Sequence, residues 1–531
     1  MDVSEQTTID LEAGSEWRFE LEGDETIAVR VHSQDRVYIN SQEIPPATWY
    51  PIHRNTKSAI YAPTPARVEV SPLPISQYTS TSTTQPQLIN LHLALERIRL
   101  LAKRNLSSAN GASPNGPSRG PRVMVIGPPS SGKTTVVKNL VNMALGSGMG
   151  WSVGVVGLDP ASASHPLETN LIPGCLSLST PISPLPTHHL AHPLGSPPSS
   201  VPASTLSADV ATLGWWYGHL EPANRGTDIW RKLVTTMGER WRERCEKDPI
   251  GLFVDTSSAF TNPMLGTRKD DPKARYSLLA QAIECFEIDV LLVLGHEKLT
   301  IDLDRLLSPR GVRVLRIPKS GGAVDLDDTF RQSSQAFQIR AYFYGEPSLP
   351  KEISSLVGRS VARETGLSPY SFQIGWETLT ILRVGEENAA PSSALPIGST
   401  HALSPTRLTR VNPSGPAHVV RLLNTVLAIV AIKPEDRLKK DDVKQQAVKS
   451  EGEESEVKQE EGGKEEATEI EEADEDDVPF REEIGWREVF GFIVITAIDA
   501  QRKKYTVLSP SPGKLPSTVA IAGSLEWVDS E

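Results

Sequence analysis

No apolar run in the sequence approaches the roughly 20 residues that are needed to cross a bilayer. The first residues, Met1 to Glu5, also lack the basic region followed by an apolar one that marks a secretory leader. Cysteine is scarce: Cys175, Cys245 and Cys285 are spaced neither like a zinc site nor like a disulfide framework. We therefore expect a protein that is neither secreted nor membrane-bound, with cysteines that are ordinary packing residues in a reducing compartment.

Positive charge is also in short supply, because the formal net charge of the 531 residues is −12. This deficit is local. Between Glu451 and Asp477 there are 15 acidic residues against two lysines, which leaves the rest of the chain at +1. The net charge therefore does not exclude a basic groove on a folded domain. The acidic stretch itself is typical of a solvated segment, the alternative being a docking site for a basic partner.

The length is too great for one hydrophobic core and predicts about three domains. Short β-rich runs such as Ile27–Val31 and Arg67–Val70 predict an antiparallel sandwich, and a helical pattern follows over Leu88–Asn105. We assign residues 1–106 to this sandwich and its linker helix. Residues 107–120, which are rich in Ser, Asn, Gly and Pro, are predicted to be a flexible linker.

Apolar strands alternate with helix-like stretches over residues 121–345, which predicts an α/β domain with a parallel sheet covered on both faces. The clearest predicted strands are Val123–Ile126, Val153–Leu158, Leu252–Asp255, Val290–Leu294 and Val312–Ile317. Within this domain, the Pro-, Ser- and His-rich stretch Thr180–Ser207 predicts a surface insertion. Four histidines in or near it lack the spacing of helical metal ligands and are expected in a solvated loop, namely His165, His188, His189 and His192.

Residues 346–531 are predicted to form a smaller C-terminal α+β domain. We expect a helix around Val419–Val430 and strands at Phe492–Ile498 and Tyr505–Leu508. The acidic composition predicts a disordered insertion at about 434–483, which interrupts this domain.

The pattern G-x-x-x-x-G-K-[ST] occurs at Gly127–Thr134, between a predicted strand and a helix-compatible run. Such a loop holds phosphates with its backbone N–H groups and with the helix N-terminus. Lys133 would reach the β and γ phosphates, and the Thr134 hydroxyl would ligate Mg²⁺. The predicted ligand is ATP with Mg²⁺, and the residues expected to bind it in this loop are Gly127, Ser130, Ser131, Gly132, Lys133, Thr134 and Thr135.

A nucleotide site of this kind also needs a carboxylate near the metal ion. Asp159 and Asp255 each follow a predicted strand, and either one could hold Mg²⁺ directly or through water. The structural alternative for each is a turn or helix-cap residue. Asp159 is favoured, because kinases of this architecture often carry an acid at the end of the strand that follows the loop's helix.

Further motifs occur in order along the chain: Leu158-Asp159, Pro173-Gly174-Cys175, Ile317-Pro318-Lys319-Ser320-Gly321-Gly322, Ile339 to Gly345, and Ser509 to Pro516. With the phosphate loop, they resemble the polynucleotide 5′-hydroxyl-kinase family. The resemblance is greatest to its fungal-type Clp branch, the ATP-binding subunits of the nuclear mRNA cleavage and polyadenylation factor. It implies a β-sandwich that closes over the nucleotide, a central P-loop domain and a C-terminal domain. It also implies that Glu16 and Lys57 contact ATP, although both would otherwise pass for surface charges.

Three positions depart from the active kinases of that family. Ser162 stands where they carry the glutamine of Asp-x-Gly-Gln, and Ala259 where they carry the tryptophan of Thr-x-Gly-Trp. In the lid, Leu326 replaces the first arginine, while Arg331 retains the second. Phosphoryl transfer depends on positioning and charge stabilisation, so these losses favour a protein that binds ATP without efficient turnover.

The resemblance therefore implies an ATP-binding scaffold in the nucleus, required for the endonucleolytic cleavage step of polyadenylation-dependent mRNA 3′-end formation. Its expected partners are a larger cleavage-factor subunit with a polymerase II tail-interaction domain and other 3′-end processing subunits, with weak or indirect RNA contact. The alternative is an active RNA 5′-hydroxyl kinase that uses Lys133, Asp159 and Arg331. A GTPase switch is disfavoured because no Asn/Thr-Lys-x-Asp element occurs.

Overall fold

The structure is a computed structural model. It describes residues 6–53, 56–107, 117–162, 172–181, 212–222, 226–245, 250–267, 275–345, 349–357, 368–385, 406–411, 422–437, 479–510 and 514–529. The four histidines noted above, most of the predicted insertion at Thr180–Ser207 and most of the predicted insertion at 434–483 lie outside these residues, as do residues 108–116 of the predicted linker. No helix among the described residues is long and apolar enough to cross a bilayer.

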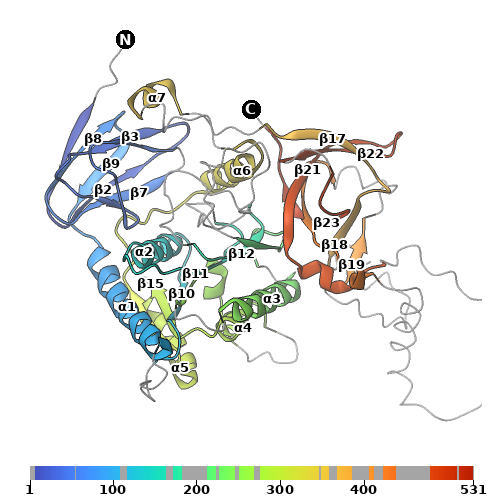
Figure 1. Cartoon of the computed structure of the whole chain (residues 1–531), viewed down its shortest axis with the longest axis horizontal. Helices are drawn as coiled ribbons and strands as arrows, with labels where there is room; N and C mark the ends of the chain where they lie inside the picture. The colour runs from blue at the N-terminus through green and yellow to red at the C-terminus, as the bar shows by residue number, and fades with distance from the viewer. Residues whose placement is uncertain are drawn as a thin grey trace, which may run out of the picture.

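The N-terminal part is a sandwich of two antiparallel sheets, as predicted (Figure 1). One sheet contains, in order, β1 (Thr7–Leu11), β8 (Ala66–Ser71), β3 (Ile27–Val31) and β6 (Trp49–Ile52). The other contains β5 (Gln42–Glu43), β4 (Tyr38–Ile39), β7 (Lys57–Ala62), β2 (Ser15–Glu20) and β9 (Ser76–Ser80). Apolar side chains from both sheets, such as Trp17, Val29 and Val68, form one buried core, while the alternate residues of each strand face outward. Helix α1 (Gln85–Ser107) then leads into the central domain.

The central domain is built on a seven-stranded sheet, which confirms the predicted α/β class. Its strand order is β13 (Leu213–Trp216), β12 (Cys175–Ser179), β11 (Gly154–Leu158), β14 (Leu252–Thr256), β10 (Arg122–Ile126), β15 (Val290–Leu294) and β16 (Arg313–Ile317). The five strands from β11 to β16 are parallel, and β12 and β13 extend the sheet in antiparallel pairing. Because parallel strands end at the same edge, the loops after β10, β11 and β14 meet there.

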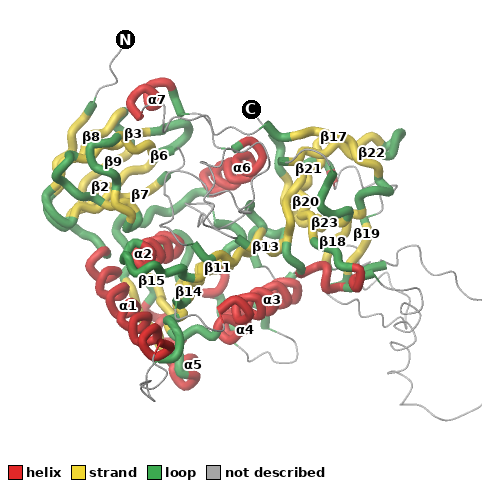
Figure 2. The backbone as a smooth tube through the Cα atoms, viewed as in Figure 1, coloured by secondary structure: helices red, strands yellow, loops and turns green. Residues whose placement is uncertain are grey.

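Helices cover both faces of this sheet, as Figure 2 shows. Alternate side chains of β10 point in opposite directions: Val123 and Val125 pack with α1 and α2 (Lys133–Leu145), whereas Met124 and Ile126 pack with the opposite layer. That layer contains α3 (Thr227–Cys245), α4 (Ser277–Phe286), α5 (Glu297–Leu307) and the 3-10 turn η2 (Ser258–Thr261). Both faces of β10, β11, β14 and β15 are therefore buried, which explains the continuous apolar runs of these strands, whereas the edge strand β16 is largely exposed.

The C-terminal part is a second seven-stranded sheet. Its order is β17 (Tyr370–Gly375), β22 (Lys504–Ser509), β21 (Val489–Asp499), β20 (Thr425–Val430), β23 (Val519–Glu526), β18 (Thr380–Val384) and β19 (Leu408–Arg410). The helix predicted around Val419–Val430 is wrong, because β20 is a fully buried strand at the centre of this sheet. A short apolar run that is buried on both faces has no period of two, so its pattern cannot be told from that of a buried helix.

Two helices link the parts. Helix α6 (Asp328–Tyr344) buries Tyr342 and Phe343 against the C-terminal core. Helix α7 (Lys351–Val357), which follows it in the chain, turns back to the N-terminal sandwich. There Ile353 and Val357 pack against Ala28 of β3 and Trp49 of β6. The remaining short elements are η3 (Ser308–Arg310), η4 (Pro434–Asp436) and η5 (Glu482–Trp486).

The joint between the central and C-terminal sheets has a close backbone contact at Gly218 and Gly523. The Ser524 amide donates a hydrogen bond of 2.8 Å to the Gly218 carbonyl. A Cβ atom on Gly523 would lie only 2.3 Å from that same carbonyl oxygen. Glycine is therefore required at position 523 for the two backbones to approach this closely.

Candidate nucleotide-binding site

The phosphate loop, Gly127–Thr134, joins the end of β10 to the start of α2. Ser130 and Gly132 both have left-handed backbone conformations, with φ of 53° and 87°. A Cβ atom on Gly127 would lie 2.8 Å from the Ser131 Oγ atom. The glycines thus permit the tight turn that begins α2 and gathers backbone N–H groups at its N-terminus.

Two side chains of the loop suit it to a phosphate. The Oγ atom of Ser131 is buried and has no hydrogen-bond partner within the described part of the chain. Lys133 is 7% exposed, and its Nζ atom donates to the Pro128 carbonyl at 3.1 Å. Burial lowers the pKa of Lys133, and the carboxylates of Asp159 and Asp255 partly offset that effect. An anion in the loop would stabilise the charged lysine and satisfy the serine.

Thr134 contacts Asp255, whereas the sequence had favoured Asp159 as the carboxylate near the metal ion. The Thr134 hydroxyl donates a 2.7 Å hydrogen bond to Asp255 Oδ2. Asp255 is completely buried at the end of β14. Burial raises its pKa to about 7, with a further increase from the nearby charge of Asp159. This hydroxyl–carboxylate pair is the donor set that a magnesium ion with bound phosphates takes in P-loop sites.

Asp159 directly follows β11 and lies close enough to Lys133 for the two charges to interact. Its Oδ1 atom accepts a 3.1 Å hydrogen bond from the Ala161 amide. Burial raises the pKa of Asp159, and the charge of Lys133 opposes this increase. The charge of Asp159 therefore acts on Lys133 of the phosphate loop. The Thr134 hydroxyl, in contrast, donates its hydrogen bond to Asp255. We propose both carboxylates as groups that could hold Mg²⁺, directly or through water.

The raised pKa of Asp255 predicts a pH-dependent stability of the nucleotide-free protein. The folded state binds a proton on Asp255 more tightly than the unfolded state between about pH 4 and pH 7, so this group's contribution to stability falls as pH rises through that window. Asp255→Asn should therefore stabilise the protein relative to wild type at pH 8, by on the order of a few kcal/mol, and not at pH 4. Melting temperatures of both proteins in a chelator would measure this, and an equal difference at the two pH values would contradict it.

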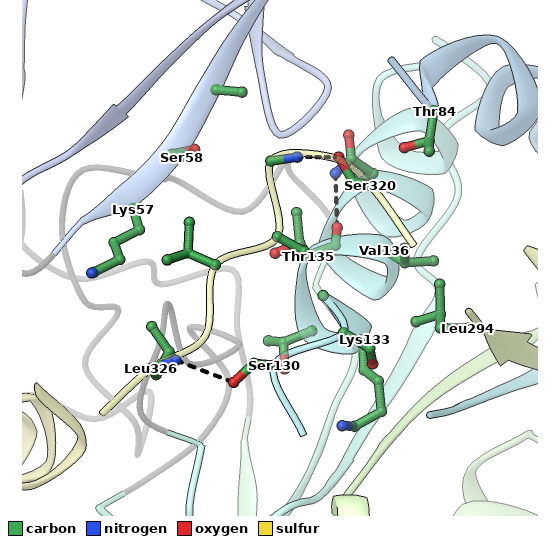
Figure 3. A pocket seen from close by; sticks show the side chains of 18 of the residues that line it. Lys57, Ser58, Thr84, Ser130, Lys133, Thr135, Val136, Leu294, Ser320 and Leu326 are labelled. Carbon is green, nitrogen blue, oxygen red and sulfur yellow. Dashed lines mark hydrogen bonds between the residues drawn. The ribbon is translucent and has the colours of Figure 1, made fainter. Parts of the chain in front are cut away.

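The segment before α6, together with the first turn of that helix, lies over the phosphate loop. The Leu326 amide donates to Ser130 Oγ at 3.3 Å (Figure 3), and the Arg331 Nη2 atom donates to the same oxygen at 3.0 Å. The Asp327 side chain caps α6 by accepting from the Phe330 amide at 2.8 Å. Arg331 thus contacts the loop directly, whereas Leu326 reaches it only through its backbone.

Glu16 belongs to β2 of the N-terminal sandwich and is buried beside the loop's pocket. Its carboxylate accepts hydrogen bonds from the Arg18 guanidinium at 2.9 and 3.0 Å and from the Thr83 hydroxyl. Arg18 also lies against Gly322 of the central domain, where a Cβ atom would come within 2.8 Å of its Nε atom. Glu16 is therefore held in place at the junction of the two domains.

Lys57, from the neighbouring strand β7, also lines the pocket. Its Nζ atom donates to Glu20 at 2.8 Å and to Glu22 at 3.1 Å. Burial opposes its charge, but these two carboxylates outweigh that effect and raise the pKa of Lys57. The ammonium also lies 4.9 Å from the centre of the Phe330 ring. Lys57 therefore stays cationic, and it contacts the first turn of α6, which covers the phosphate loop.

These residues enclose one pocket of about 190 Å³ between the N-terminal sandwich and the central domain. It is lined by the phosphate loop, by Asp159 and Arg331, by Glu16 and Lys57, and by the start of α1. In Figure 3, Thr84 and Ser320 lie at one end of the view and Lys133 at another. With the exception of Gly127, which lies at the start of the loop and does not line the pocket, the sequence-predicted binding residues therefore come together around it.

Two of the positions that depart from active kinases also lie near it. Ser162 lines the pocket, and its carbonyl accepts a hydrogen bond from Gln338 at 2.9 Å. Ala259 is in η2, where its amide donates to the Ser257 side chain at 3.3 Å. Ala259 has no ring that could stack on an RNA base, and Ser162 offers a short hydroxyl where the active kinases carry a glutamine amide.

Sequence reasoning missed several polar residues of the pocket. They are Asn40, Thr84, Gln85, Asn139 and Ser320. Arg18, which holds Glu16 but does not line this pocket, was missed as well, although the alternation of a strand places residues 16, 18 and 20 on one face. The other residues carry no local signal, because they meet only when the sandwich docks on α2.

Three family models match consecutive parts of the chain. Residues 10–102 match the N-terminal beta-sandwich domain of polyadenylation factor. Residues 127–345 match the mRNA cleavage and polyadenylation factor CLP1 P-loop. Residues 367–529 match the pre-mRNA cleavage complex II protein Clp1.

Full-length relatives are similar throughout. A protein named mRNA cleavage and polyadenylation factor CLP1, from Cryptococcus neoformans var. neoformans serotype D, is 61% identical over 99% of both chains. The protein of the same name from Laccaria bicolor is 33% identical over 97% of both chains. A CLP1 homolog from Arabidopsis thaliana is 30% identical over 98% of this chain and 94% of its own.

Two solved structures share the fold. A structure of a wild-type Clp1p–Pcf11p complex has a TM-score of 0.68 at 21% identity, over 99% of both chains. A second structure concerns the extended interface between Pcf11p and Clp1p and the basis of ATP loss in a point mutant. It has a TM-score of 0.69 at 22% identity, again over 99% of both chains. At these identities the similarity establishes the fold alone.

Proposed function

This chain belongs to the Clp1 family of mRNA cleavage and polyadenylation factors, and on this basis we propose that it is an ATP-binding scaffold subunit of a pre-mRNA cleavage factor complex. In this role it binds ATP with Mg²⁺ without efficient turnover. It is required there for the endonucleolytic cleavage step of polyadenylation-dependent mRNA 3′-end formation in the nucleus. The resemblance to this family that the sequence suggested is thereby confirmed.

The observation that carries the ATP proposal is the composite pocket. Its lining comes from the sandwich, from the phosphate loop and from the segment before α6. A ligand that touches all three stabilises one arrangement of the domains, because it binds that arrangement better than any other. Lys133, Ser131 and the N-terminus of α2 would hold the phosphates, while Thr134 and Asp255 would hold Mg²⁺.

The segment before α6 and the first turn of that helix, which lie over the phosphate loop, favour retention of the terminal phosphate over its transfer. Active sites of this class use lid cations to neutralise the charge that develops on the phosphoryl group. Here Leu326 offers only a backbone amide, so Arg331 is the one cation that this segment directs at Ser130 within the described residues.

The experiment has two readouts from one preparation. The protein is purified without added nucleotide, denatured, and its released ligand identified; a second aliquot receives labelled ATP and an RNA with a 5′-hydroxyl end. We expect intact ATP to be released and the RNA to remain unlabelled. Release of ADP, or of nothing, would refute retention of ATP.

A second candidate function is RNA 5′-hydroxyl kinase activity, which the raised pKa of Asp159 favours. A carboxylate whose pKa is raised by burial is a better general base for a hydroxyl proton, and Asp159 lies beside Lys133 in the pocket. Label on the RNA that disappears in Asp159→Asn, while ATP binding persists, would establish this function in place of the scaffold.

We also propose that the chain binds the larger cleavage-factor subunit that carries a polymerase II tail-interaction domain, with other 3′-end processing subunits and at most weak RNA contact. The complex of Clp1p with Pcf11p supports this, since the two folds match along their whole length. Co-purification of the two subunits from a host that expresses both would test it. Elution of the two as separate species at micromolar concentration would refute it.

A further inference from the structure

We propose that Gln85 recognises the 6-amino group of the adenine base by a hydrogen bond and thereby selects ATP over nucleotides with a 6-oxo base. This inference rests on the proposed nucleotide binding and adds the residue that would determine base specificity. Gln85 is the first residue of α1 and lines the composite pocket. An amide side chain can present either a donor or an acceptor, so its orientation decides which base it accepts.

The orientation of Asn139 follows from its hydrogen bonds. Asn139 is buried on α2, one turn beyond Thr135. Its side chain lies 2.7 Å from the Thr135 carbonyl oxygen. A carbonyl oxygen can only accept a hydrogen bond, so the Asn139 atom that faces it must be Nδ2. The Oδ1 atom therefore points the other way, toward Ser41 and Gln85.

The orientation of Gln85 follows from that of Asn139. The Gln85 atom that lies 3.3 Å from Asn139 Oδ1 must be the donor Nε2. Rotation of the Gln85 amide by half a turn would place two oxygens face to face, which is repulsive. The Gln85 Oε1 atom is thus directed away from Asn139, and it makes no hydrogen bond to any residue that the structure describes.

This unpaired acceptor belongs to the part of the pocket that suits a base. The phosphates are expected near Lys133 and Ser130, and Thr84, the neighbour of Gln85, lies away from Lys133 in Figure 3. Leu88, in the same first turn of α1 as Gln85, adds an apolar lining residue for the face of a purine. The 6-amino group of adenine would donate to Gln85 Oε1, whereas the 6-oxo group of guanine or hypoxanthine would oppose it with a second acceptor.

The test compares the affinities of the nucleotide-free protein for ATP and ITP by calorimetry in the presence of Mg²⁺. ITP has the same phosphates and sugar, and it differs at the 6-position of the base. We expect wild type to favour ATP by about tenfold or more, the usual penalty for a polar group left without a partner. Gln85→Leu should reduce this ratio to about twofold or less, because the acceptor is gone.

Asn139→Leu should reduce the ratio in the same way, because it frees the Gln85 amide to rotate. Asn139 is therefore a positioning residue, and selectivity rather than affinity is its readout. The matched control is Asn142→Leu, one turn further along α2. Asn142 Nδ2 donates to the Asn40 carbonyl at 2.9 Å and so also docks the sandwich, whereas the described side-chain bond of Gln85 is to Asn139. Its ratio should remain that of wild type.

The outcomes separate this inference from the proposed function. Equal binding of ATP and ITP by wild type, or full selectivity in Gln85→Leu, would overturn the reading of the 6-position while leaving nucleotide binding intact. Absence of binding by either nucleotide would refute the proposed function itself. If Asn139→Leu does not fold, Gln85→Leu still decides the question, because Gln85 is only partly buried.

Discussion

Replacing Lys133 by methionine is expected to lower the affinity for ATP by about 100-fold or more and to yield protein that purifies without nucleotide. Lys133 is buried near Asp159 and Asp255, and within the described part of the chain its Nζ atom donates a hydrogen bond only to the Pro128 carbonyl. Without its charge, the two carboxylates would face the phosphates directly. Calorimetry with ATP and Mg²⁺ gives the affinity, and the ligand released on denaturation gives the occupancy.

Methionine is chosen because it preserves most of the buried length of the lysine while removing the charge. The nucleotide-free variant should therefore melt at or above the temperature of nucleotide-free wild type, since a buried ammonium no longer has to be desolvated. Lys103→Met is a control for the substitution, because Lys103 lies on α1 over the Trp151 ring, outside the pocket. Normal ATP retention by Lys133→Met would show that the phosphates lie elsewhere.

Gly523→Ala is expected to weaken the joint between the central and C-terminal sheets by about 3 kcal/mol or more. The added Cβ atom would meet the Gly218 carbonyl oxygen at 2.3 Å and the Gly218 Cα atom at 2.5 Å. Both obstacles are backbone atoms, so the two sheets must separate to relieve the overlap. The Ser524–Gly218 hydrogen bond would be lost with them.

Thermal melting and limited proteolysis would measure this loss. We expect a lower melting temperature and faster cleavage between the two domains. Gly375→Ala is the matched control, because its Cβ atom would approach nothing closer than Thr378 Oγ1 at 3.5 Å, an ordinary contact. If both variants melt alike, the close contact at Gly523 contributes little to the joint.

Much of the central domain could be predicted from the sequence because its middle strands, β10, β14 and β15, are buried on both faces and each is followed by a helical element. The runs at Val123–Ile126 and Val290–Leu294 correspond to β10 and β15 almost residue for residue. The phosphate loop could be located because its glycines are dictated by local backbone geometry. Constraints of this kind act within a few residues of the chain, so the residue types at those positions reveal them.

Features that depend on distant contacts left no such trace. The buried run Thr425–Val430 became a strand because two neighbours in the sheet, β21 and β23, provide its hydrogen bonds. The contact of Thr134 with Asp255 rather than Asp159 depends on which strand lies beside β10, and that is a matter of sheet order. The binding roles of Glu16 and Lys57 stay predictions, although the structure brings both to the pocket.

Helix α7 makes the N-terminal sandwich a domain with two attachments. The chain leaves the sandwich through α1 and returns to it more than 240 residues later, where Ile353 and Val357 cover Trp49. A truncated protein that ends at residue 345 would expose this apolar patch to water, and a fragment of the sandwich alone would do the same. Separation of the sandwich from the nucleotide pocket is therefore limited to short excursions about two tethers, which keeps its effective concentration at the pocket high.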